Sequence, residues 1–228
     1  MRRHLLVRVS AAVALLLLIA PQAAQAAGII YVKWDSPTNG PGTSWSNAYR
    51  TIQAGINAAT WEDVWVARGT YNEHITLKTE ISVYGGFAGN ETSLNQRPPF
   101  PRPESDPCAS IINGGGWSSH ESGHLVRIPA NAGYHTALDG FTVQQGASYW
   151  NDGGYPNPGT GAGILVQAGA RASIRNNLIR DNISCPNGGG IGVVDASPVI
   201  TGNVFTSNIA SGQSGGDSFG GAIACLRG

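Results

Sequence analysis

Charged residues, lysine and cysteine are scarce in this sequence, and each scarcity narrows the possible functions. Only 12% of the 228 residues are charged. If the N-terminal segment with its three arginines is not counted, 11 basic residues stand against 14 acidic ones, which gives a net charge of −3. Only two of the basic residues are lysines, Lys33 and Lys78. No basic patch is present, so we expect no nucleic-acid partner. The three cysteines, Cys108, Cys185 and Cys225, are too few for a disulfide scaffold, and their odd number leaves at least one unpaired in a monomer.

The long apolar run of the chain lies at its N-terminus. Three arginines precede apolar residues 9–20, and Ala24-Gln25-Ala26 forms a small-residue cleavage site. This run is too short to be a good membrane anchor. We therefore expect residues 1–26 to be a signal peptide and the mature protein to be secreted or displayed at the cell surface. The rest of the sequence has no stretch long and apolar enough to span a membrane.

Glycine is abundant, with 32 residues in the chain. Such a composition suits either a disordered chain or a tightly turned all-β fold. The frequent valine, isoleucine, tryptophan and tyrosine residues favour the all-β alternative, because they can bury enough apolar surface to offset the loss of chain entropy.

The last third of the chain repeats itself. Residues 174–182 align with residues 200–208, and residues 138–146 form an earlier relative of both. A second motif, in which glycine leads into a short apolar run, recurs at Gly161–Ile164, Gly188–Ile191 and Gly220–Ile223. Repeats of this length without helical periodicity predict a β-solenoid with one coil per repeat and strands about 4.8 Å apart.

Asparagine recurs at fixed places in this repeat. The alignment places Asn177 over Asn203 and Asn182 over Asn208. Asparagine tolerates the left-handed turn conformation, and stacked amides can satisfy one another. The sequence therefore predicts two asparagine ladders at the corners of the coils.

The N-terminal part of the mature chain predicts a cap for the solenoid. A helix is expected from about Asn47 to Ala58, because Tyr49, Ile52 and Ile56 form an apolar stripe at helical spacing. This stripe would cover the first coil. We expect the cap to span residues 27–62 and the coils residues 63–228, with strands at 63–67, 74–77 and 81–84.

Several motifs give the sequence a family resemblance. The segments Thr51–Asn57, Val64–Tyr71 and Val83–Gly89 resemble the opening coils of secreted right-handed parallel β-helix proteins of the pectate-lyase-like superfold. Phe205–Asn208 and Gly220–Ile223 are similar to the F-x-x-N and G-G-A-[ILV] repeats of polymorphic outer-membrane proteins, a group of bacterial surface adhesins. The resemblance implies an all-β, right-handed parallel β-helix and a role at the cell surface.

The segment His120–His124 reads HESGH and matches the zinc-protease signature H-E-x-x-H. That chemistry requires a helix carrying both histidines and a third zinc ligand. Glycines precede and interrupt the segment, a strand-like run follows it, and no glutamate occurs after Glu121. We interpret the segment as a loop entering a strand and expect no bound metal and no cofactor.

An enzyme remains the alternative interpretation, because the pectate-lyase-like superfold includes polysaccharide lyases and glycoside hydrolases. Their signature motifs are absent from the sequence, and fold alone does not establish an activity. We therefore predict no catalytic residue. We interpret the later aspartates as turn residues: Asp139, Asp152, Asp181, Asp195 and Asp217.

The loop 148–158 is the best candidate for ligand binding in the sequence. Tyr149, Trp150 and Tyr155 can offer flat faces for sugar stacking, and Asp152 can accept hydrogen bonds from hydroxyl groups. The alternative is that these aromatic side chains fold back and cover the solenoid wall. The first alternative predicts an extracellular polysaccharide or surface glycan as the partner.

The sequence ends within an apolar run at residues 222–228 that has no polar cap. An uncapped coil exposes strand edges. We expect either a fragment of a longer protein or a partner that covers this end, self-association included. The combined hypothesis is an exported, non-catalytic β-helix for cell-surface attachment or extracellular glycan binding.

Overall fold

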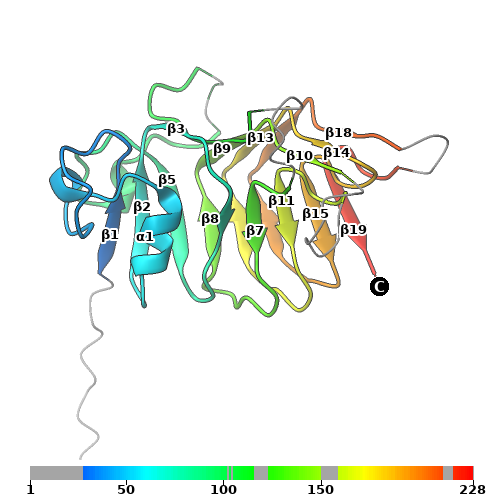
Figure 1. Ribbon diagram of the computed structural model, residues 1–228, viewed down its shortest axis with the longest axis horizontal. Helices are drawn as coiled ribbons and strands as arrows, with labels where there is room; N and C mark the ends of the chain where they lie inside the picture. Colours follow the sequence, from blue (N-terminus) through cyan, green and yellow to red (C-terminus); the bar gives the residue numbers. More distant parts are fainter. Residues whose placement is uncertain are drawn as a thin grey trace, which may run out of the picture.

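The strands of the chain stack into four sheets that run along one axis (Figure 1). The computed structural model describes residues 28–101, 103, 105–115, 123–149, 159–212 and 218–227. Every pairing between two strands is parallel. The predicted all-β parallel β-helix is therefore confirmed.

The four sheets are numbered here 1 to 4. Sheet 1 contains β1 (Ile29–Val32), β2 (Asp63–Ala67), β5 (Ser82–Phe87), β8 (Ala137–Asp139), β12 (Ser173–Arg175) and β16 (Val199–Thr201). Sheet 2 contains β3 (Gly69–Tyr71), β6 (Ser110–Asn113), β9 (Phe141–Gln144), β13 (Leu178–Arg180) and β17 (Val204–Thr206). Sheet 3 contains β10 (Ala147–Ser148), β14 (Ile183–Ser184) and β18 (Ile209–Ala210). Sheet 4 contains β4 (Ile75–Thr76), β7 (Val126–Ile128), β11 (Ile164–Val166), β15 (Ile191–Val194) and β19 (Ile223–Leu226).

The register of the sheets follows the sequence repeats. In sheet 1, Ile174 pairs with Leu138 on one side and Ile200 on the other. In sheet 4, Ile164 pairs with Ile191, which in turn pairs with Ile223. Each sequence repeat is therefore one coil, as predicted.

The predicted asparagine ladders are present at two corners. The Asn177 side-chain oxygen accepts from the Phe141 N–H (3.0 Å), and its amide nitrogen donates to the carbonyl of Leu138 (3.0 Å) and to Asn203 Oδ1 (3.0 Å). Asn182 repeats this arrangement at the next corner. Both amides are fully buried, so each ladder satisfies backbone groups that no strand pairing reaches.

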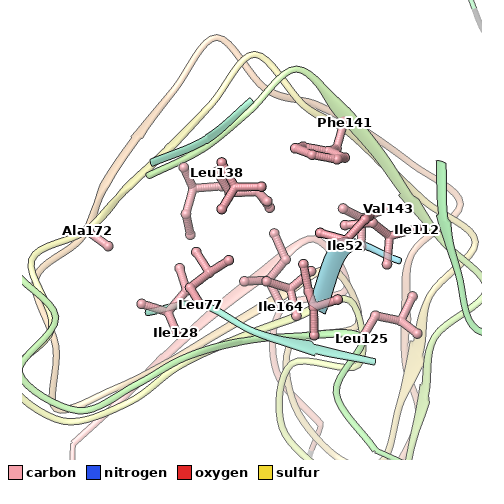
Figure 2. Packing of buried hydrophobic residues seen from close by; sticks show 14 of the residues in the cluster. Ile52, Leu77, Ile112, Leu125, Ile128, Leu138, Phe141, Val143, Ile164 and Ala172 are labelled. Atoms are coloured by element: carbon pink, nitrogen blue, oxygen red, sulfur yellow. The ribbon is translucent and has the colours of Figure 1, made fainter. Parts of the chain in front are cut away.

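The hydrophobic core lies inside the coils. Figure 2 shows side chains from three walls pointing inward, including Leu138 and Phe141 from consecutive strands of one coil and Ile164 from the opposite wall. Leu138 and Ile164 are completely buried. Because side chains alternate along a strand, one row of each strand enters this core and the other row faces outward.

The N-terminal helix is shorter than the sequence predicts. Helix α1 spans Ile52–Ala58, and the hydroxyl of its N-cap residue, Thr51, accepts from a backbone N–H of the first turn. The expected start near residue 47 is wrong: Trp45–Asn47 form the 3₁₀ helix η1, and Tyr49 forms a parallel bridge with Val32. Ile52 and Ile56 nevertheless pack into the core, and α1 lies at the end of the stack opposite β19 (Figure 1).

At this end, side chains and loops form hydrogen bonds with the backbone groups at the outer edges of β4 and β1. The Thr76 N–H donates to Gln53 Oε1 (2.7 Å), and Gln53 Nε2 donates to the carbonyl of Thr76 (3.3 Å), so α1 covers the edge of β4. The backbone of Tyr31 in β1 pairs with Gly42 and with Tyr49. Helix α1 and the residues before it therefore cover the edges of β4 and β1 at the N-terminal end of the solenoid.

A single carboxylate holds the turn after β5. Glu91 accepts from the backbone N–H groups of Ala88 (2.6 Å), Gly89 (2.9 Å) and Asn90 (3.0 Å). Trp45 Nε1 donates to the carbonyl of Glu91 (2.8 Å), which ties η1 to this turn. Burial of the Glu91 carboxyl raises its pKa, but the backbone donors, its own N–H included, together outweigh burial and leave the pKa below its ordinary value.

The Glu91 turn predicts a pH-dependent stability. Because the folded-state pKa is lower than the unfolded one, the stabilisation is present above the unfolded value of about 4.3 and is lost as the pH falls through the folded-state pKa. Glu91→Gln should lower the free energy of unfolding by about 1–2 kcal/mol at pH 7. Urea unfolding at pH 7 and pH 3 measures both effects. A variant that loses as much stability as the wild type between these pH values would contradict this role.

Candidate functional site

Aromatic side chains form a second cluster on the outer face of sheet 1. Trp65, Tyr84 and Phe87 are buried there and pack against Tyr31 and Trp45. The rings of Trp65 and Phe87 stack with centroids 4.6 Å apart. The N-terminal segment therefore covers the outside of the first coils, and Tyr84 lies near the edge of this cover, in register with Asp139 of the next strand.

A hollow of about 180 Å³ lies where this cover ends, and we call it the Asp139 hollow. One wall comes from residues 94–100, which begin with the 3₁₀ helix η2 (Leu94–Gln96), and the other from the corners that follow β8 and β12. Its lining consists of Leu94, Arg97, Pro98, Pro99, Phe100, Asp139, Gly140 and Asn176. The hollow thus combines proline and phenylalanine surfaces with a small polar group.

Asp139 is the centre of the polar group. Its carboxylate accepts from Arg97 Nη1 (3.2 Å) at one oxygen and from Arg175 Nε (2.7 Å) at the other. Asn176 Nδ2 lies 3.4 Å from the first oxygen. The carboxylate is almost completely buried, so two charge-assisted pairs offset the cost of removing it from water.

The two arginines are held differently. Arg97 also donates to the carbonyl of Gly85 (2.9 Å) and lies over the rings of Tyr84 (5.3 Å) and Phe87 (5.4 Å). Its side chain is therefore fixed on the aromatic cluster. The Arg175 side chain is 39% exposed. Its hydrogen bond to Asp139 raises its pKa, so it remains a cation with donors that reach solvent.

The structure corrects the interpretation of Asp139. The sequence predicts a turn residue, but Asp139 is the last residue of β8 and is buried between two arginines. Asp181 and Asp195 do have left-handed backbones, with φ of 54° and 47°, as expected for turns. Asp152 and Asp217 lie outside the described residues.

Most of the predicted ligand-binding loop lies outside the described residues. Trp150, Asp152 and Tyr155 lie outside the described residues. Tyr149, the first aromatic residue of the loop, follows β10 directly and is half-buried. The roles of these four side chains stay predictions.

The HESGH segment is described only at its end. His120 and Glu121 lie outside the described residues, whereas His124 is buried just before β7 and belongs to no helix. His124 Nδ1 lies 3.0 Å from the carbonyl of Gly161. Within the part of the chain that the structure describes, no three His, Cys, Asp or Glu side chains are grouped to hold a metal ion. No helix of that same part is long and apolar enough to cross a membrane.

From the sequence we did not identify the two arginines that bind Asp139, of which Arg97 lines the hollow, or an exposed cation–π pair. The repeat alignment already placed Asp139 beside Arg175, so this pair could have been found from the register. Arg97 could not, because it lies outside the repeats. Tyr134 is 64% exposed, and Arg171 lies over its ring at 5.6 Å and donates to its hydroxyl (3.2 Å).

Comparison with known protein families gives one match. A family model described as "Protein of unknown function (DUF1565)" matches residues 36–223, which includes most of the coils and the Asp139 hollow. No curated protein and no solved structure matches the chain. Since the match covers most of the sequence, the chain belongs to the DUF1565 family.

Proposed function

We propose that this protein is an exported, non-catalytic β-helix that binds an extracellular saccharide at the Asp139 hollow. The observation that carries the proposal is the buried Asp139 carboxylate between Arg97 and Arg175, next to apolar proline and phenylalanine surfaces. Sugar rings present both hydroxyl groups and apolar C–H faces. A site with oriented polar groups beside apolar walls suits both.

The charge of the site favours a ligand that accepts hydrogen bonds. Both Asp139 oxygens already accept from arginine, so the polar groups left for a ligand are mainly donors on Arg175 and Asn176. Two guanidinium groups against one carboxylate give the site a net positive charge. We expect the ligand to present hydroxyl oxygens or carboxylate groups to these donors.

The size of the hollow favours contact with one sugar ring at a time. Its volume of about 180 Å³ is below the roughly 300–1,000 Å³ of pockets that enclose drug-sized ligands. A longer saccharide would lie across the outer face of sheet 1 and insert one ring. Binding of this kind to a surface polysaccharide would also attach the protein to a cell.

The surroundings of Asp139 favour binding over catalysis. Glycoside hydrolysis generally uses two carboxyl groups, one of which must be protonated to act as an acid. Asp139 is the one carboxylate in the described lining, and both of its oxygens accept hydrogen bonds from arginine. It is therefore suited to orienting Arg175 toward a ligand.

Arg175→Ala should weaken saccharide binding by at least about tenfold. A glycan array would identify the ligand, and titration calorimetry would measure its affinity for the wild type and the variant. Arg171→Ala is the matched control, because Arg171 belongs to the same coil as Arg175 but contacts the exposed Tyr134 ring instead of Asp139. Its affinity should equal that of the wild type.

Two results would contradict this proposal. One is an equal loss of affinity in Arg171→Ala and Arg175→Ala, which would place the ligand elsewhere or show a general charge effect. The other is cleavage of polygalacturonate or alginate that Asp139→Asn abolishes, which would make the protein an enzyme of the pectate-lyase-like type.

A further inference from the structure

An exposed tryptophan stands on a well-fixed turn after β1. Trp34 is 55% exposed, although large aromatic side chains are usually buried. The Ser36 N–H closes the turn by donating to the carbonyl of Lys33 (3.0 Å), and Arg50 Nε donates to the carbonyl of Ser36 (3.0 Å). At the start of the turn, the Lys33 N–H donates to the carbonyl of Tyr49 (2.8 Å). These hydrogen bonds hold the backbone of Trp34 in place.

The indole ring of Trp34 lies against a glycine of the first coil. Gly69 begins β3 and has a φ of 142°. A Cβ atom at this position would overlap Cδ1 and Nε1 of the Trp34 ring, so glycine is required for the ring to rest on the backbone here. The ring is therefore supported by the protein, while more than half of the side chain remains in contact with solvent.

Trp34 and the Asp139 hollow lie at the same edge of sheet 1. Trp34 comes two residues after the end of β1, and Asp139 and Gly140 of the hollow lie at the end of β8. Since the strands are parallel, the residues that follow them gather at one edge. The order β1, β2, β5 and β8 puts three strand spacings, about 14 Å, between the two places (Figure 1). A sugar ring is shorter than this, so a ligand that contacts both must contain several linked units.

The turn that Glu91 holds lies between Trp34 and the hollow. It follows β5, which stands between β1 and β8 in sheet 1. A Cβ atom on Gly89 of this turn would lie 3.5 Å from Lys33 Cε, so the turn adjoins the residue before Trp34. Residues 88–90 have short side chains, and Glu91 accepts from their backbone N–H groups. A chain of sugar units that leaves the hollow can therefore pass over this turn to Trp34.

We propose, on the basis of the proposed function, that Trp34 is a second contact for the same ligand. The ligand is then an extended saccharide, with one ring in the Asp139 hollow and another stacked on the Trp34 ring. An indole face suits the apolar C–H face of a sugar. The carboxylate of the next residue, Asp35, is 48% exposed and can accept from hydroxyl groups. Two linked contacts strengthen the binding of a long chain without changing the affinity of a single sugar for the hollow.

Titration calorimetry with sugars of increasing length tests this contact. The probes are galacturonate, mannuronate, N-acetylglucosamine and glucose, each as the single sugar and as its linear oligosaccharides. The wild type should bind the longer members of at least one series more tightly than the single sugar. Trp34→Ala should lower the affinity for these longer members by roughly five- to tenfold and leave the affinity for the single sugar unchanged.

Two further variants make the comparison specific. Trp61→Ala is the matched control, because Trp61 is similarly exposed (48%) but precedes β2 and so lies at the opposite edge of sheet 1. Its affinities should equal those of the wild type. Trp34→Phe keeps an aromatic face and should recover most of the affinity that Trp34→Ala loses.

The outcomes distinguish this contact from the hollow itself. Length-dependent binding that Arg175→Ala weakens and Trp34→Ala leaves unchanged would overturn the role of Trp34, while the proposed function would stand. Equal losses in Trp34→Ala and Trp61→Ala, or an equal loss for single sugars and long chains, would also overturn it. If the wild type binds no member of the four series, both the second contact and the proposed function are wrong.

Discussion

Replacement of Asp139 by alanine is expected to lower the free energy of unfolding by about 3–5 kcal/mol. The carboxylate is buried and pairs with Arg97 and Arg175. Its removal would take a buried carboxylate partner away from the largely buried Arg97 guanidinium, which lies on top of the aromatic cluster of Tyr84 and Phe87. Removing one partner of a buried ion pair costs far more than the pair itself contributes.

Urea unfolding of Asp139→Ala measures this loss. Asp35→Ala is the control, because Asp35 forms a solvent-exposed pair with Lys33 (3.6 Å) and should change stability by less than about 1 kcal/mol. Arg97→Ala in the Asp139→Ala background should recover part of the loss, since the buried positive charge is then removed as well. If Asp139→Ala and Asp35→Ala destabilise the protein equally, Asp139 is not the anchor of the hollow.

Asn182→Ala is expected to destabilise the protein by about 3 kcal/mol. The Asn182 side chain accepts from the Gly146 N–H (2.9 Å) and donates to the carbonyl of Val143 (3.1 Å) and to Asn208 Oδ1 (2.9 Å). Alanine would leave two buried backbone groups unsatisfied at once. Each such group costs about 1–3 kcal/mol.

The ladder contains its own control. Asn208 has the same role one coil later, where it donates to the carbonyl of Ile179 (2.8 Å), but it is less buried than Asn182. Solvent can replace part of its hydrogen bonding, so Asn208→Ala should cost about 1 kcal/mol. Thermal unfolding of both variants compares them directly. Equal losses at the two positions would show that burial does not determine the contribution of the ladder.

The fold could be predicted because it depends on a repeating pattern. The spacing that aligns Ile174 with Ile200 also determines which side chains enter the core, since a shift by one residue would turn every side chain of a strand to the other face. Asn177 and Asn182 were predictable for the same reason. Each occupies a corner that recurs in the next coil.

The features outside the repeats were harder to predict. The start of α1 depends on a competition between local helix signals and the bridge from Tyr49 to Val32, and the bridge prevails. The Asp139 hollow depends on the path of residues 94–100. The prolines there indicate an extended chain, but they do not specify that Arg97 returns over Tyr84. For this reason the turn propensity of Asp139 alone led to the prediction that it is a corner residue.

The direction of the asparagine ladders has a consequence for synthesis on the ribosome. The acceptor for the Phe141 N–H is Asn177, 36 residues later, and the acceptor for the Asn177 N–H is Asn203, 26 residues later. Each corner therefore receives its side-chain partner from a segment that is translated afterwards. A nascent coil cannot complete its corners when its own residues emerge, and ordered structure must follow translation at a distance of about one coil.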